Sequence, residues 1–173
     1  SPPAGPQGQT PPPHPVALPQ RARRRGIRGH GGAEPNPLVG CVIADAEGCI
    51  IAEGHHAYCG GPHAEVVALD CAGERARGGT AWVTLEPCSH QGRTGPCTRA
   101  LIDAGIARVV IGRRDPTAQA GGGAEVLHAA GVEVDVLDDA ACFELAAPFV
   151  HRAATGLPWV VCKWAQPIAG YIA

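Results

Sequence analysis

One ordered set of residues in the middle of the chain constrains its fold more than any other feature. A His-Ala-Glu triplet at residues 63–65 is followed by Pro87 and Cys88, and then by Cys97. One imidazole and two thiolates are three ligands of a tetrahedral zinc, and they leave a fourth position for water, as in catalytic sites. The pattern therefore predicts that His63, Cys88 and Cys97 meet around a metal ion.

Glu65 is the candidate for proton transfer at such a site. It lies two residues after His63, about 200° around an ideal helix, so it does not share the ligand's face. It still reaches the site if the N-terminus of that helix points at the metal. A carboxylate there can take a proton from water that zinc activates and deliver it to a departing amine. Such ligands with a non-ligand Glu are typical of zinc deaminases.

The composition of the chain limits the classes of partner and the cellular location that it suggests. The 173 residues are enough for one ordinary core. Charged residues make up 17% and the net charge is −2, so no global charge attracts nucleic acid or anionic lipid. No apolar run reaches the ~18 residues of a membrane span, and the first residues lack the features of a signal peptide. We expect a cytoplasmic chain whose cysteines stay reduced.

Apolar periodicity predicts alternating strands and helices. Residues 39–44 and 49–53 are typical of a hairpin, and a helix is expected to begin near His63. Further strands are expected at 80–85, 108–112 and 132–137, with helices at 96–104 and 124–130. This order predicts a three-layer α/β/α domain with a five-stranded mixed sheet. A helix at 138–152, broken near Pro148, and a last strand at 158–163 are expected to follow.

The N-terminal region has a different amino-acid composition. Residues 1–33 are rich in Pro, Gly and Arg and are predicted to be a disordered tail. The glycines within residues 21–33 oppose a helix there. The arginines between Arg21 and Arg28 are interpreted as a solvated basic run.

The stretch between the two cysteines carries a specific resemblance. Eight residues separate Cys88 from Cys97, where the general deaminase pattern has two. The sequence TLEPCSH at residues 84–90, followed by GRTGPC at 92–97, is similar to the riboflavin-biosynthesis pyrimidine deaminases, the diaminohydroxyphosphoribosylaminopyrimidine deaminase family. Asn36 within PNP and Asp115 with Pro116 also resemble substrate loops of that family.

The resemblance implies a site as well as a fold. It implies a cytidine-deaminase-like domain at residues 34–152, zinc on His63, Cys88 and Cys97, and proton transfer by Glu65. It further implies that Asn36 contacts the pyrimidine. The ribose phosphate is then held by His90, Arg93 and Thr94. An Arg beside a Thr on a glycine-bearing loop also suits a phosphate on physical grounds.

The activity implied is hydrolytic deamination of 2,5-diamino-6-(5-phosphoribosylamino)pyrimidin-4-one in riboflavin biosynthesis. The expected partner is this small molecule, with no membrane or nucleic-acid partner, and homo-oligomerisation is left open. Residues 153–173 resemble the start of the reductase domain that commonly follows this deaminase. No reductase activity is expected from these residues.

Several alternatives stay open. The chemistry could act on cytidine, guanine or a tRNA base, although the eight-residue insert argues against this. The chain could also be a non-catalytic, zinc-stabilised fragment, because the family's first helix is not recognisable. Nucleic-acid binding through the arginine run is a third alternative. His55 and His56 follow the second predicted strand and are interpreted as pocket-wall or structural residues rather than zinc ligands.

Overall fold

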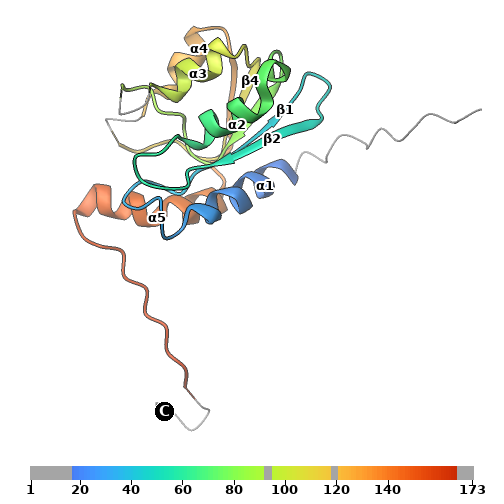
Figure 1. The fold of residues 1–173 in the computed structure, drawn as a ribbon. Coiled ribbons are helices and arrows are strands. Elements are labelled where there is room, and N and C mark those ends of the chain that lie inside the picture. Colours follow the sequence, from blue (N-terminus) through green and yellow to red (C-terminus); the bar gives the residue numbers. More distant parts are fainter. Residues whose placement is uncertain (1–16, 92–94, 118–120, 167–173) are drawn as a thin grey trace, which may run out of the picture.

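Five strands form one mixed sheet with helices on both faces (Figure 1). The computed structural model describes residues 17–91, 95–117 and 121–166. The strands are β1 (Gly40–Ala44), β2 (Ile50–His55), β3 (Thr80–Val83), β4 (Arg108–Ile111) and β5 (Glu133–Val136). The helices are α1 (Ala17–Gly26), α2 (Ala64–Ala72), α3 (Cys97–Asp103), α4 (Gly123–Ala129) and α5 (Ala140–Thr155), with short 3₁₀ turns at Ile27–Gly29 and Gly73–Ala76.

The sheet has the order β2-β1-β3-β4-β5. β1 pairs antiparallel with both β2 and β3, whereas β3, β4 and β5 run parallel. The predicted five-stranded mixed sheet and its opening hairpin are therefore confirmed. All five residues of β1 are buried, as expected for a strand covered on both faces.

Two layers of helices cover this sheet (Figure 1). Helices α2, α3 and α4 lie on one face, and α1 and α5 lie on the other. The main core lies under α2 and α3 and contains Ile43, Ile111, Leu101 and Leu127. Gly54 permits the close approach of α2, since a Cβ there would lie 2.1 Å from the carbonyl oxygen of Ala64. That packing fixes where the N-terminus of α2 points.

Helix α1 corrects the prediction of a disordered tail. Residues 17–26 are helical and pack against the sheet, with Leu18 and Ala22 buried beside Val42. A Cβ on Gly40 would lie 1.9 Å from the carbonyl oxygen of Ala22, so a glycine at this position lets α1 approach β1. The folded domain thus extends N-terminally of residue 34, while the rest of the predicted tail, residues 1–16, lies outside the described residues.

The C-terminal expectations also need correction. Helix α5 continues from Ala140 to Thr155 with Pro148 inside it, so it is not broken there and it crosses the predicted domain boundary at residue 152. Asp139 caps its N-terminus by accepting from the N–H groups of Ala141 and Cys142. Residues 158–163 form no strand and lie in an extended segment that leaves the domain (Figure 1). In the part of the chain that the structure describes, no helix is both long and apolar enough to span a bilayer.

Candidate active site

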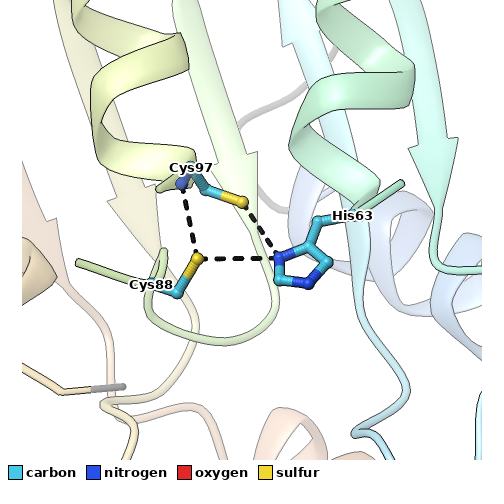
Figure 2. Close-up of side chains that lie close together, drawn as sticks. All are labelled: His63, Cys88 and Cys97. Atoms are coloured by element: carbon cyan, nitrogen blue, oxygen red, sulfur yellow. Dashed lines mark hydrogen bonds between the residues drawn. The ribbon is translucent and has the colours of Figure 1, made fainter. Parts of the chain in front are cut away.

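Three ligand-type side chains converge at one edge of the sheet (Figure 2). His63 is the N-cap residue of α2, Cys97 is the first residue of α3, and Cys88 lies in the loop after β3. The parallel β3-α3-β4 unit and the packing of α2 against α3 bring these three points together. The predicted meeting of His63, Cys88 and Cys97 is present in the structure.

The spacing of the donor atoms fits a tetrahedral metal. Nδ1 of His63 lies 3.2 Å from Sγ of Cys97 and 3.6 Å from Sγ of Cys88. Zinc with bonds of about 2.3 Å to sulfur and 2.0–2.1 Å to nitrogen at tetrahedral angles would separate these atoms by about 3.6 Å. All three donor atoms lie within 4.8 Å of one another. The set therefore fits one zinc-sized cation with three protein ligands.

The protonation of the two thiols also favours a cation. The hydrogen bond with Cys97 and the neighbouring His63 lower the pKa of the Cys88 thiol to about 4. The same hydrogen bond and burial raise the pKa of the Cys97 thiol. The hydrogen bond to Cys88 in turn raises the pKa of His63. One thiolate forms readily and suppresses the second, so a bound cation would be needed to hold both.

Glu65 lies in the first turn of α2 and is 3% exposed. Its side chain lines the same cavity as His63. This arrangement is the one expected from the sequence if the N-terminus of the helix points at the site. Burial raises the pKa of this carboxyl to about 6. A carboxyl with a pKa near neutrality can both accept and release a proton at the working pH.

The cavity in front of these residues has a volume of about 490 Å³, the size of a small-molecule site. It is lined by Asn36 and His90, two of the residues predicted to bind substrate. The other two, Arg93 and Thr94, lie outside the described residues. The structure thus brings Asn36, Glu65 and His90 to one cavity with the ligand cluster, and their roles stay predictions.

Sequence reasoning gave no role to several residues of this cavity. Glu86 lines it, is 5% exposed, and accepts hydrogen bonds from the N–H groups of Asp115 (3.0 Å) and Ala124 (2.9 Å). It thereby connects the segment after β3 to the loop that carries Asp115 and to the first turn of α4. Phe149 and Ala153 of α5 supply part of an apolar wall. No local motif marks them, because only the tertiary packing of α5 brings them to the site.

The α/β/α fold, the His/Cys/Cys cluster and the adjacent buried glutamate are together typical of the cytidine-deaminase-like class. Residues 18–113 match the model of the cytidine and deoxycytidylate deaminase zinc-binding region, and the chain belongs to this family. The matched segment contains all three ligand-type residues and Glu65.

Comparison with individual proteins gives a narrower group of relatives than the family model. The chain is 47% identical to riboflavin biosynthesis protein RibD of Escherichia coli over 154 residues. This alignment covers 87% of this chain and 41% of that protein. It superposes with a TM-score of 0.84 and 41% identity on the diaminohydroxyphosphoribosylaminopyrimidine deaminase/5-amino-6-(5-phosphoribosylamino)uracil reductase of Thermotoga maritima, over 88% of this chain and 45% of that one. RibD of Acinetobacter baumannii gives a TM-score of 0.78 at 43% identity, over 83% and 40% of the two chains. The chain therefore spans less than half the length of these three relatives.

Proposed function

We propose that this chain is a zinc-dependent hydrolytic deaminase that acts on 2,5-diamino-6-(5-phosphoribosylamino)pyrimidin-4-one in riboflavin biosynthesis. The observation that carries the proposal is the placement of buried Glu65 and the His63/Cys88/Cys97 cluster at one cavity of about 490 Å³. The likeness to RibD proteins supports the choice of substrate, because one such relative is named as the deaminase of this pyrimidine.

The residues of the site divide the reaction between them. When bound by His63, Cys88 and Cys97, zinc supplies a Lewis acid that makes water nucleophilic near neutral pH. Glu65 accepts a proton from the attacking water as its oxygen bonds to the ring carbon that bears the amino group. Glu65 then returns the proton to the amino nitrogen, and the C–N bond breaks so that ammonia leaves. The second hydrogen of the water passes to the adjacent ring nitrogen, and the carbon that carried the amino group becomes a carbonyl.

The substrate contacts are part of the same proposal. Asn36 binds the pyrimidine from one wall of the cavity, and His90 lies at the cavity on the loop that leads toward Arg93 and Thr94. We assign the ribose phosphate to these three residues, since an Arg and a Thr on a glycine-bearing loop offer charge-assisted hydrogen bonds to phosphate oxygens. No role in the reductase reaction is assigned to these residues.

Ammonia release tests the proposal directly. Purified protein loaded with one zinc per chain should release ammonia from the phosphoribosyl precursor. Glu65→Gln should bind zinc equally and lower kcat by about 10²–10⁴-fold, the usual effect of removing a general acid–base group. Cytidine, guanine and a tRNA anticodon stem-loop serve as comparison substrates. Equal rates for the wild type and Glu65→Gln would contradict the mechanism, and normal zinc content without turnover on any substrate would favour a non-catalytic domain.

A further inference from the structure

A buried histidine outside the His63/Cys88/Cys97 cluster has a hydrogen-bond partner at each of its two ring nitrogens. His56 follows β2, is 3% exposed and lines the cavity. Its Nδ1 lies 2.9 Å from the carbonyl oxygen of Pro62, and its Nε2 lies 3.0 Å from Nδ2 of Asn36. Its ring also contacts that of His63 edge to face, with ring centroids 5.4 Å apart. One side chain therefore touches the predicted substrate residue and the segment that leads into a metal ligand.

These contacts fix the chemical state of both side chains. A carbonyl oxygen can only accept, so Nδ1 of His56 carries the hydrogen. In the neutral ring Nε2 is then bare and can only accept. The atom of Asn36 that faces it is the donor Nδ2, 3.0 Å away, which agrees with an accepting Nε2. The polar atom that Asn36 keeps for a ligand as an acceptor is its carbonyl oxygen Oδ1.

We propose that His56 is a positioning residue that holds the amide of Asn36 so that its carbonyl oxygen reads an N–H donor on the pyrimidine. The inference deepens the proposed function and rests on it. This wall of the cavity then presents a hydrogen-bond acceptor to the ligand. A ligand whose facing edge carries a ring N–H or an amino group can donate to Oδ1, whereas an edge with only lone pairs leaves Oδ1 unpaired. His56 acts through Asn36 and does not itself contact the substrate.

The contact with Pro62 extends the effect to the metal side of the cavity. The Pro62 carbonyl belongs to the peptide bond that precedes His63, the N-cap residue of α2. By donating to this oxygen, His56 holds the substrate residue and the ligand-bearing segment in a fixed relation. A substitution that removes both hydrogen bonds should disturb ligand orientation more than metal affinity, because His63 keeps its own donor atom.

A double-mutant cycle between His56 and Asn36 tests the proposal. The cycle is measured in the Glu65→Gln background, which blocks turnover, as the dissociation constant of the phosphoribosyl precursor by isothermal titration calorimetry. His56→Phe should weaken binding about tenfold when Asn36 is present, the effect of one buried hydrogen bond. In the Asn36→Ala background the same substitution should change binding less than about twofold. His56→Gln, whose amide oxygen can accept from Asn36, should recover most of the loss.

Controls separate this inference from the function on which it rests. His55→Phe changes the neighbouring histidine, which does not line the cavity, and should leave binding within about twofold of its parent. Zinc content and Tm are recorded for every variant, so that a loss of fold is recognised. An effect of His56→Phe that is equally large with and without Asn36 would overturn the positioning role and indicate direct contact. Binding of the precursor without ammonia release from the wild type would instead overturn the proposed activity alone, and no binding at all would overturn both.

Discussion

At the scale of single residues, the ligand cluster is held by the starts of two helices. His63 and Cys97 both lie at helix N-termini, and the N–H of Cys97 lies 3.3 Å from Sγ of Cys88. Unpaired N–H groups at such positions stabilise a neighbouring thiolate. This local geometry favours a thiolate at Cys88, the form in which a cysteine binds a metal ion.

Loss of a single donor should remove the metal. Cys88→Ser should lower zinc affinity by more than about 100-fold, since even the loss of a group that only supports a ligand costs 10–100-fold. Zinc per chain after dialysis against a weak chelator measures this by elemental mass spectrometry. The matched control is Cys71→Ser, because Cys71 is exposed and does not belong to the cluster. Full zinc retention in Cys88→Ser would contradict the assigned ligand set.

Some contacts between single residues could be predicted from the sequence, and others could not. The meeting of His63, Cys88 and Cys97 could be predicted because metal sites use few residue types at few spacings. His56 was interpreted only as a pocket-wall or structural residue, and its partner Asn36 lies 20 residues earlier. Glu86 was missed for a similar reason, since its N–H donors are Asp115, in a later loop, and Ala124, in the first turn of α4. Contacts between distant segments have no local pattern.

At the scale of elements, the strands and the helices between them were predicted, but α1 was not. Its sequence combines many arginines with only a few apolar residues and ends at Gly26. A ten-residue helix of this kind is marginal in isolation and owes its stability to packing. Leu18 and Ala22 pack on the sheet, while Arg21 and Arg25 pair with Glu53 of β2. The basic run that was interpreted as solvated is therefore partly used to attach α1.

The attachment of α1 should depend on pH. Burial of Glu53 opposes its ionisation, but the hydrogen bonds from Arg21 and Arg25 outweigh burial and lower the pKa of this carboxyl. Ionised Glu53 therefore stabilises the fold above the ordinary glutamate pKa of ~4.3, and this contribution is lost as the pH falls through the lowered folded value. Glu53→Gln should lower the free energy of unfolding at pH 7 by roughly 1 kcal/mol, because both arginines are partly exposed.

Urea unfolding between pH 3 and 7 measures this dependence. The variant should lose less stability than the wild type on acidification, so the two curves converge at low pH. Glu47→Gln is the control, since Glu47 is exposed in the turn between β1 and β2. Parallel curves for the wild type and Glu53→Gln would show that the ion pairs do not attach α1.

At the scale of the whole molecule, sheet order positions the site. The parallel pair β3 and β4 places the start of α3 at the same edge as the loop after β3, and α2 crosses β2 and β1 to bring His63 there. Helix α5 on the opposite layer contributes Phe149 to the cavity wall. The family match ends at residue 113, so Phe149 lies outside the matched segment.

The extended C-terminal segment contrasts with this packed domain. Residues 157–166 leave the fold after Gly156, and Val160, Val161 and Trp164 are 72%, 77% and 68% exposed. Within this segment the structure records two contacts with α5: the ring of Trp159 lies against that of His151, and the N–H of Leu157 donates to Oγ1 of Thr155 (3.1 Å). Apolar side chains that stay in water contribute little to the free energy of folding and favour association.

Ending the chain at Gly156 should therefore leave the domain intact. We expect a change in Tm of no more than about 3 °C, since one exposed ring contact and one exposed hydrogen bond together contribute about 1 kcal/mol or less. Sedimentation velocity should show less self-association, and zinc content should be unchanged. The opposite truncation, which begins the chain after Gly26, should lower Tm by several times as much, because it uncovers Val42 and Trp82. A large drop in Tm for the C-terminal truncation would mean that residues after 156 belong to the domain's core, and equal drops for both would reject the division between an attached α1 and a detached C-terminal segment.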